Sequence, residues 1–190
     1  GKAAQVPAGA RLVQADVRSP EARQLVATGR FEVVNHQAAQ IDVRVSVSDP
    51  ALDARINVLG TLNVLEGARR AGSRKVVFAS SGGTIYGDVD PEDLPVTEAH
   101  PQRPVAPYGV SKKVATDYLH AYRELHQLEY TSLALANVYG PRQEPPGEAG
   151  QQLREDLVGV GRLRNDVLGG GTAGARVGRR HVGQPQLAGV

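Results

Sequence analysis

Apolar residues in the first 140 positions of the 190-residue chain recur with two alternating spacings. Continuous runs rich in Val, Leu, Phe and Ala are typical of buried parallel strands, and they predict strands at residues 12–15, 31–36, 75–79 and 133–136. Apolar positions three and four residues apart are typical of helices, and they predict helices at residues 20–28, 50–71 and 107–126. Strands that alternate with helices in this order predict a parallel sheet with crossover helices.

The predicted helices carry suitable boundary residues. Ser19 can act as the N-cap of the first helix, with Pro20 at its first position. Asp49 and Pro50 open the second helix, and Gly72 ends it. The third helix places four residues on one face: Val110, Val114, Tyr118 and Tyr122.

Polar residues follow the predicted strands at the edge where parallel sheets bind their ligands, beyond the carboxyl ends of the strands. The segments at these ends are Asp16, His36–Gln40, Ser80–Thr84 and Asn137–Tyr139. We therefore expect the functional residues among them.

The residue pattern changes after residue 150. Residues 151–190 contain nine Gly, six Val and no aromatic residue, and after a possible short helix at 151–158 no helical or strand period remains. Gly169–Gly171 is not a phosphate loop, because no strand precedes it and no helix follows it. We expect residues 1–150 to form one domain and residues 151–190 to be a poorly packed or disordered tail.

The charge of the chain also separates these two parts. Residues 151–190 carry six Arg against three acidic residues, whereas residues 1–150 carry 16 basic and 17 acidic residues. Without a basic stripe that contains aromatic side chains, we expect no nucleic-acid partner. No apolar run approaches the roughly 18 residues of a membrane span, so we expect no membrane partner.

The chain contains no Cys and no Met. It can therefore form no disulfide, no thiolate metal site and no Cys nucleophile, which fits a reducing, cytoplasmic location. The five His residues lack the spacing of metal ligands, so no metal site is expected. Because the sequence starts at Gly1 without a Met, we expect a processed chain or a fragment.

Tyr108 and Lys112 form the strongest chemical signal. Their spacing of four residues places both side chains on one helix face. A lysine ammonium close to a phenol lowers the pKa of the phenol from its usual value of about 10, which would make Tyr108 a general base. The alternative is an aromatic core residue beside a solvated lysine.

The surrounding motifs decide between these interpretations, because several occur in a compatible order. They are Ala15–Val17, Val34–Ala39, Asn57–Thr61, Phe78–Gly87, Pro107–Lys112 and Asn137–Arg142. With them, residues 1–150 resemble the extended short-chain dehydrogenase/reductase family, in particular its NAD-dependent nucleotide-sugar epimerases. The resemblance implies a Rossmann-like, doubly wound parallel sheet, NAD as cofactor, a nucleotide-sugar substrate and a homodimer that pairs helices 50–71 and 107–126 between subunits.

The resemblance also assigns the catalytic residues. Tyr108 would exchange a proton with the sugar 4-hydroxyl, and Lys112 would bind the nicotinamide ribose and tune Tyr108. The family usually has Ser or Thr four residues before Tyr86, where this chain has Gly82. A neighbouring hydroxyl is expected to replace it, with Ser81 as the first choice and Thr84 as the second.

The remaining assignments concern binding. Asn137 would face the diphosphate of the substrate, with a plain turn residue as the alternative. His36 is expected to have a structural role. The alternative for Asp16 is a helix cap or turn residue, and Asn57 would take the structural asparagine position of the family. The cofactor-binding residues implied by the resemblance are Asp16 and Val17 beside the adenine, Gln37, Ala38 and Ala39 after the second strand, and Asn57 and Ser80.

Two departures from the family pattern matter. The Gly-x-x-Gly-x-x-Gly turn that binds the pyrophosphate is absent, from which we infer an N-terminal truncation. Such a chain would leave strand 31–36 without a neighbour, bind NAD weakly and be poorly soluble. The tail does not resemble the family either, and an out-of-frame translation would explain it.

The expected activity is that of a UDP-sugar 4-epimerase, which oxidises the C4 hydroxyl and then reduces the ketone from the other face. A nucleotide-sugar 4,6-dehydratase is the enzymatic alternative. That reaction needs an added acid and base, which the dehydratases of the resembled family place as Asp-Glu right after the catalytic Thr, where this chain has Gly83 and Thr84. The alternative of another class is a non-catalytic, Rossmann-like fragment.

Overall fold

The computed structural model of the chain describes residues 6–7 and 9–138. The described residues all belong to one structural unit, Gly1–Pro141. The predictions for the tail at 151–190, including its short helix, lie outside the described residues.

Three parallel strands form the sheet, in the order β1 (Val33–His36), β2 (Lys75–Ser81) and β3 (Glu129–Leu135). In the middle strand, Val76 is aligned with Val34 on one side and with Tyr130 on the other. Side chains of β2 alternate between buried and half-buried positions, because successive residues of a strand point to opposite faces. The expectation that strand 31–36 has no neighbour is wrong, since β1 pairs with β2.

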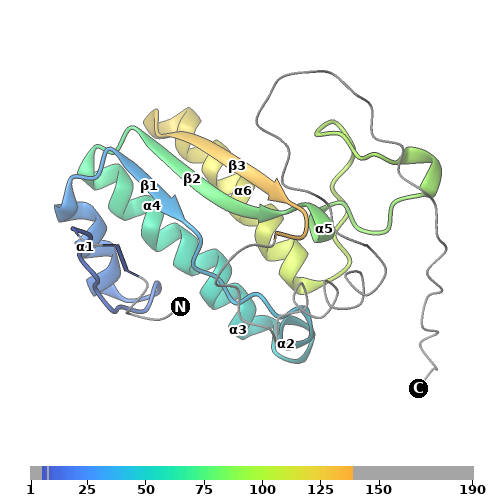
Figure 1. Ribbon diagram of the computed structural model, residues 1–190, viewed down its shortest axis with the longest axis horizontal. Coiled ribbons are helices and arrows are strands. Elements are labelled where there is room, and N and C mark those ends of the chain that lie inside the picture. The colour runs from blue at the N-terminus through green and yellow to red at the C-terminus, as the bar shows by residue number, and fades with distance from the viewer. Residues whose placement is uncertain (1–5, 8, 139–190) are drawn as a thin grey trace, which may run out of the picture. The chain divides into compact units, whose positions relative to one another are not determined.

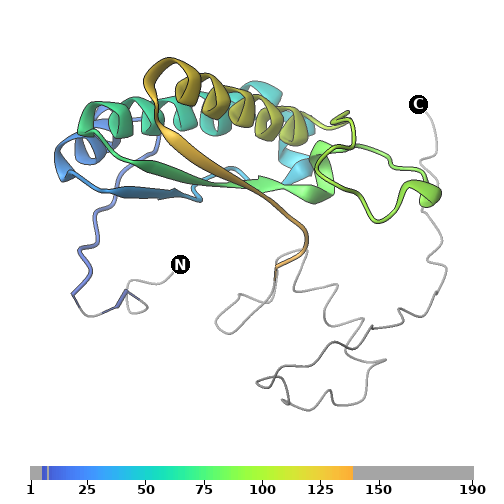
Figure 2. The ribbon, with the colours of Figure 1, turned by 90° about the horizontal axis from the view of Figure 1, so that it is seen from above.

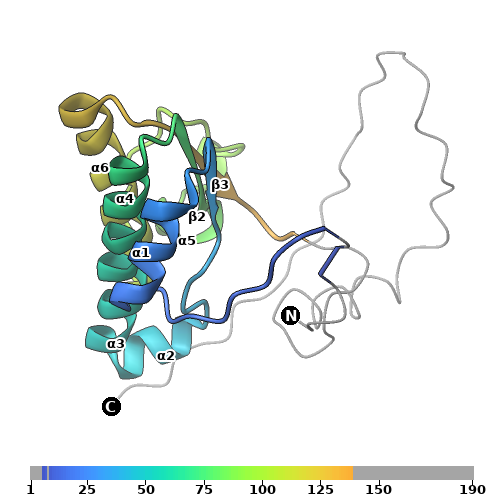
Figure 3. The ribbon, with the colours of Figure 1, turned by 90° about the vertical axis from the view of Figure 1, so that its left-hand side faces the viewer.

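The helices α1 (Pro20–Gly29), α4 (Gly60–Ala71) and α6 (Pro107–His126) lie on one face of this sheet (Figures 1 and 2). Figure 3 shows α4 and α6 side by side, with α1 next to α4 and the strands all on one side of these helices. Among the described residues, none of these long helices covers the opposite face. The core lies between helices and sheet and consists of Leu65, Ala68, Val76, Phe78, Ala115, Leu119 and Leu128.

The helix predicted at 50–71 is present as three continuous segments. They are α3 (Pro50–Ala54), the π-helical turn η2 (Arg55–Leu59) and α4, and Gly72 ends the helix in the left-handed conformation with φ 68°. A π turn inserts one extra residue into the helix and turns the following side chains toward a different direction. Asn57 lies in this turn and is buried.

The helix boundaries follow the capping rules. Ser19 Oγ accepts a hydrogen bond of 3.1 Å from Ala22 N at the start of α1, as predicted. Two short elements were not expected from the sequence: α2 (Val43–Ser48), which Asp42 caps, and α5 (Gly82–Ile85), which follows β2 directly. A short 3-10 turn, η3 (Pro91–Asp93), lies in the loop before α6.

Two sequence predictions differ from the structure. Residues 12–15 form no strand, because no described strand lies beside them, and Leu12 is 62% exposed. The predicted row on α6 is not its core face: Val110 and Tyr118 are exposed, while Ala115 and Leu119 are buried. Within the described part of the chain, no helix is long and apolar enough to cross a membrane.

Candidate active site

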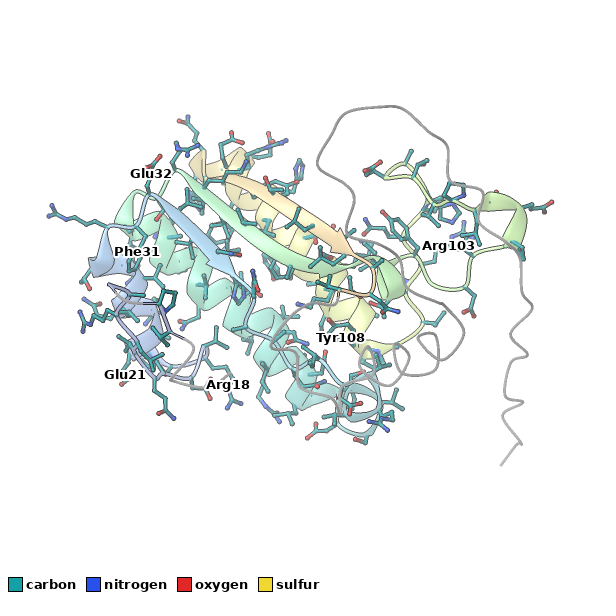
Figure 4. All side chains as sticks on the ribbon, in the orientation of Figure 1. Arg18, Glu21, Phe31, Glu32, Arg103 and Tyr108 are labelled. Carbon is teal, nitrogen blue, oxygen red and sulfur yellow. The ribbon has the colours of Figure 1, made fainter. Side chains whose placement is uncertain are left out.

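The carboxyl end of β2 and the amino end of α6 meet at the edge of the sheet where the sequence predicts a site. Figure 4 shows Tyr108 at the start of α6. An alanine at Gly109 would place its Cβ 2.6 Å from the carbonyl oxygen of Thr84, which is closer than atoms can approach. Glycine at this position therefore lets α6 start directly against α5.

Lys112 is buried, with 3% of its surface exposed, so the alternative of a solvated lysine is wrong. Its Nζ donates a hydrogen bond of 2.9 Å to the carbonyl oxygen of Ala79 and lies 4.8 Å from the ring centroid of Phe78. Burial lowers the pKa of Lys112 to about 8, and the negative charge of Asp53 opposes this change. Lys112 is thus a buried ammonium group that loses its proton close to neutral pH.

Tyr108 is half-buried, and the Nζ of Lys112 lies 5.7 Å from its ring centroid. Burial raises the pKa of Tyr108, a hydrogen bond with Ser81 lowers it, and the charge of Asp53 raises it. The net change is upward, so the expectation of a lowered Tyr108 pKa is wrong for the structure described. The loss of water around the phenolate outweighs the stabilisation that Ser81 provides.

Three hydroxyl groups lie close to this pair. Ser81 forms the hydrogen bond with Tyr108. The Oγ of Ser80 and the Oγ1 of Thr84 are buried and have no hydrogen-bond partner among the described residues. Buried hydroxyl groups normally have a partner, because an unpaired one costs about 1–3 kcal/mol. Two such groups at one strand end indicate a place built to receive polar atoms of another molecule.

A buried polar cluster, which sequence reasoning missed, supports the site from behind. Asp53 is fully buried, and its Oδ2 accepts a hydrogen bond of 2.6 Å from Ser111 Oγ. Its Oδ1 accepts hydrogen bonds from Gln40 Nε2 at 3.0 Å and from Asn57 Nδ2 at 2.9 Å. Asp53 precedes Asn57 by one helical turn, and this spacing was the only sequence signal for the cluster.

Asn57 also fixes the loop that follows β1. Its Oδ1 accepts from Gln40 N and its Nδ2 donates to Gln40 O, each at 2.9 Å. This pairing gives Asn57 a structural role, while its contact with the cofactor stays a prediction. The loop held in this way contains Gln37, Ala38 and Ala39.

The first turn of α6 is held by a second missed residue. Ser46 in α2 is fully buried, and its Oγ accepts a hydrogen bond of 3.1 Å from Tyr108 N. This N–H is one of the donors that a helix start leaves without a partner in the helix. Nothing in the sequence signals this contact, because 62 residues separate the two positions.

His36 and the scattered acidic residues form no metal site. His36 is 5% exposed, and its Nε2 lies 3.0 Å from Thr61 Oγ1, which itself donates to the carbonyl oxygen of Asn57. Because the Thr61 proton is used, His36 donates through Nε2. Burial and the charge of Lys112 lower the pKa of His36 to about 4. Across the described residues no group of three His, Cys, Asp or Glu could hold a metal ion.

Other predicted binding residues lie at different places. Asp16 is exposed and pairs with Arg18, whose guanidinium lowers the pKa of Asp16 to about 2. The carbonyl oxygen of Val17 accepts a hydrogen bond of 2.8 Å from Asn63 in α4. No contact joins Asp16 or Val17 to the Tyr108 site in the described structure. Asn137 follows β3 and is exposed.

A cavity of about 250 Å³ opens beside α5 and the end of β3. Its size approaches the lower limit of small-molecule sites, about 300 Å³. The lining residues are Gly82, Tyr86, Val96, Thr97, Glu98, Ala134 and Ala136. Of these, Gly82 and Tyr86 belong to the motif at 78–87, and Gly82 occupies the position where the resembled family usually has Ser or Thr.

Comparisons with known proteins agree with this arrangement. A model of the NAD dependent epimerase/dehydratase family matches residues 1–159. The UDP-glucose 4-epimerase of Mycolicibacterium smegmatis is 48% identical over 139 residues, which are 73% of this chain and 44% of that protein.

Two solved structures are similar as well. The crystal structure of Thermus thermophilus UDP-glucose 4-epimerase in complex with NAD gives a TM-score of 0.74 at 47% identity, covering 79% of this chain and 48% of that one. The crystal structure of Thermotoga maritima UDP-glucose 4-epimerase with UDP-glucose gives a TM-score of 0.73 at 38% identity, covering 80% and 49%. The predicted Rossmann-like parallel fold is confirmed, and the chain spans about half the length of the relatives it matches.

Proposed function

The chain belongs to the NAD dependent epimerase/dehydratase family, and from this membership we propose that the protein is a nucleotide-sugar 4-epimerase that acts on a UDP-sugar. The observation that carries the proposal is the pairing of Tyr108 with the buried Lys112 beside the hydroxyl groups at the end of β2. The M. smegmatis relative bears the name UDP-glucose 4-epimerase, and the T. maritima structure contains UDP-glucose.

The residues present fit the nicotinamide end of NAD. Lys112 Nζ has three N–H donors and uses one for the carbonyl oxygen of Ala79, so two remain for the ribose hydroxyls. The buried, unpartnered Oγ of Ser80 is a further polar group at this place. Gln37, Ala38 and Ala39 would line the cofactor, and Asp16 and Val17 would lie beside the adenine. Bound here, NAD would supply the hydride acceptor and donor for the sugar carbon.

The chain's own residues would move the proton. In its phenolate form, Tyr108 would take the proton of the sugar 4-hydroxyl. Its Oη would return this proton when the ketone is reduced. Because burial raises the pKa of Tyr108, forming this phenolate requires groups that favour it. The Lys112 ammonium would fill this role, and the single O–H of Ser81 would donate to the sugar oxygen. Thr84 is the second candidate for that donor, and Asn137 would face the diphosphate.

A 4,6-dehydratase is the alternative within the family. Eliminating water from the sugar requires an acid and a base next to the catalytic hydroxyl. The residues that follow position 82 are Gly83 and Thr84, and neither carries a carboxylate. The nearby acidic residue on the cavity wall is Glu98, which lies in the loop before α6. This distribution favours epimerisation.

A non-catalytic, Rossmann-like fragment is the alternative of another class. It is favoured by the absence of the Gly-x-x-Gly-x-x-Gly turn from the 190 residues, since a pyrophosphate normally binds at such a turn. Calorimetry with NAD tests it. We expect no binding in the micromolar range by the 190-residue chain, and micromolar affinity would contradict this expectation.

The test of the epimerase proposal uses a hybrid that supplies this turn. In the hybrid, residues 31–138 replace the matching segment of the T. thermophilus enzyme. We expect it to convert UDP-glucose into its C4 epimer. Tyr108→Phe should abolish turnover while NAD binding is retained. A Tyr108→Phe hybrid with unchanged turnover would refute the role of Tyr108.

A homodimer and a cytoplasmic location complete the proposal. The helices expected to pair between subunits carry exposed apolar side chains, among them Leu59 at 56% and Val110 at 46%. The absence of Cys supports a reducing compartment. Sedimentation of the hybrid tests the homodimer. The hybrid should sediment as a dimer, and its Val110→Glu variant should sediment as a monomer.

A further inference from the structure

The carboxylate of Asp53 lies buried behind the start of α6. None of its surface is exposed, and it accepts three hydrogen bonds, from Ser111 Oγ, Gln40 Nε2 and Asn57 Nδ2. Each partner can donate, which suits an ionised carboxylate, because that group only accepts. A buried charge is stable only when hydrogen bonds and an opposite charge compensate for the loss of water.

The opposite charge is that of Lys112. Lys112 follows Ser111 directly in the chain, so the residue that donates to Asp53 is the neighbour of the buried ammonium. Lys112 is 3% exposed, and in the described structure the hydrogen-bond acceptor of its Nζ is the carbonyl oxygen of Ala79 rather than a carboxylate. The carboxylate of Asp53 therefore attracts the Lys112 ammonium without a direct hydrogen bond, and in the water-poor interior this attraction is stronger than in water.

The other groups around Lys112 do not supply this charge. The ring of Phe78 in β2 contributes a cation–π contact at 4.8 Å. His36 in β1 is neutral at pH 7, because its pKa is about 4. Tyr108 on α6 has a raised pKa and is neutral as well. Asp53 in α3 is the acidic group that favours the charged form of Lys112.

We propose that Asp53 is a positioning residue of this site: its buried carboxylate keeps Lys112 charged, and its bond to Ser111 fixes the turn that carries Tyr108 and Lys112. The importance of that charge for catalysis rests on the proposed function. The charge itself does not, and it can be measured without turnover.

The chain is well suited to this measurement, because it contains four lysines: Lys2, Lys75, Lys112 and Lys113. Lysine labelled with ¹³C at Cε gives one NMR signal for each, and the signal lost in Lys112→Arg identifies Lys112. Each signal is followed from neutral to alkaline pH in the 190-residue chain. The midpoint of each titration curve is then compared between variants.

Asp53→Asn removes the charge and keeps the shape, and the Ser111 hydroxyl can turn to accept from the new amide. We expect the Lys112 midpoint to move to lower pH, on the order of one pH unit, while the other three lysines do not change. Ser111→Ala removes the hydrogen bond but keeps the charge, so its Lys112 midpoint should stay near that of the unchanged chain. Glu66→Gln is the matched control, because Glu66 is a carboxylate on α4 that pairs with Arg69.

An unchanged Lys112 midpoint in folded Asp53→Asn would overturn the proposal, as would an equal shift in Glu66→Gln. If circular dichroism shows that Asp53→Asn does not fold, the carboxyl carbon of Asp53 is observed in the unchanged chain. An ionised Asp53 at neutral pH supports the proposal, and a protonated Asp53 overturns it. A hybrid without epimerase activity would refute the proposed function and leave these outcomes as they are.

Discussion

Two neighbouring glycines in α5 provide a sharp test of how closely this helix packs beside the site. A Cβ on Gly82 would lie 2.7 Å from the carbonyl oxygen of Ala134 and 3.3 Å from that of Leu135, both in the backbone of β3. A Cβ on Gly83 would meet no atom within 4 Å. The two positions therefore differ in packing while sharing the same short helix.

The expected magnitudes follow from this difference. Gly82→Ala forces α5 away from a backbone that cannot rotate aside, and overpacking of this kind costs about 1–3 kcal/mol of folding free energy. Gly83→Ala restricts the unfolded chain without a clash and should stabilise the fold by about 0.4–1 kcal/mol. The two substitutions thus change stability in opposite directions.

Urea denaturation followed by circular dichroism measures both free energies of unfolding. Gly82→Ser belongs in the same series, because position 82 is where the family resemblance expects Ser or Thr. We expect Gly82→Ser to lose stability as Gly82→Ala does, which would explain why the hydroxyl facing Tyr108 comes from Ser81. Equal stability of the Gly82 and Gly83 variants would refute the packing argument. A fully stable Gly82→Ser would show that the hydroxyl fits at position 82.

Two further predictions concern buried hydrogen bonds. Ser46→Ala leaves the N–H of Tyr108 without its buried acceptor and should lower the free energy of unfolding by about 1–3 kcal/mol. Urea denaturation measures this loss, with Ser48→Ala on the exposed side of α2 as the control. The pKa of His36 is about 4 in the fold and about 6.5 in the unfolded chain, so the unfolded chain binds the proton first. The free energy of unfolding therefore falls as the pH decreases from about 6.5 to about 4, by up to roughly 3 kcal/mol. The urea midpoint of His36→Gln should therefore fall less between pH 7 and pH 5 than that of the unchanged chain; equal losses would contradict the assignment.

Much of the fold could be predicted from periodicity because its signals are local. The capping residues Ser19 and Gly72 and the continuous run at 75–79 identify a helix start, a helix end and the central strand. The strand expected at 12–15 shows the limit of this reasoning. A strand requires a neighbouring strand to accept its hydrogen bonds, and a short apolar run carries no information about that neighbour.

In the candidate site, too, local patterns could be predicted from the sequence and contacts between distant residues could not. The spacing of Tyr108 and Lys112 revealed the reactive pair, and the Ser/Gly turn after β2 revealed the hydroxyl groups beside it. The upward pKa of Tyr108 could not be predicted, because burial of its ring depends on the packing of α5 and α6. Asp53 and Ser46 were missed because their partners on α6 lie 58 and 62 residues away in the chain.

The mass of the product formed from UDP-glucose tests the central claim most directly. The hybrid that carries residues 31–138 is incubated with NAD and UDP-glucose, and the nucleotide sugar is analysed by mass spectrometry and NMR. We expect a product of unchanged mass with the configuration at C4 inverted, since Gly83 and Thr84 offer no acid and base for elimination. A 4-keto product lighter by one water would identify a dehydratase, and it would contradict the proposed function.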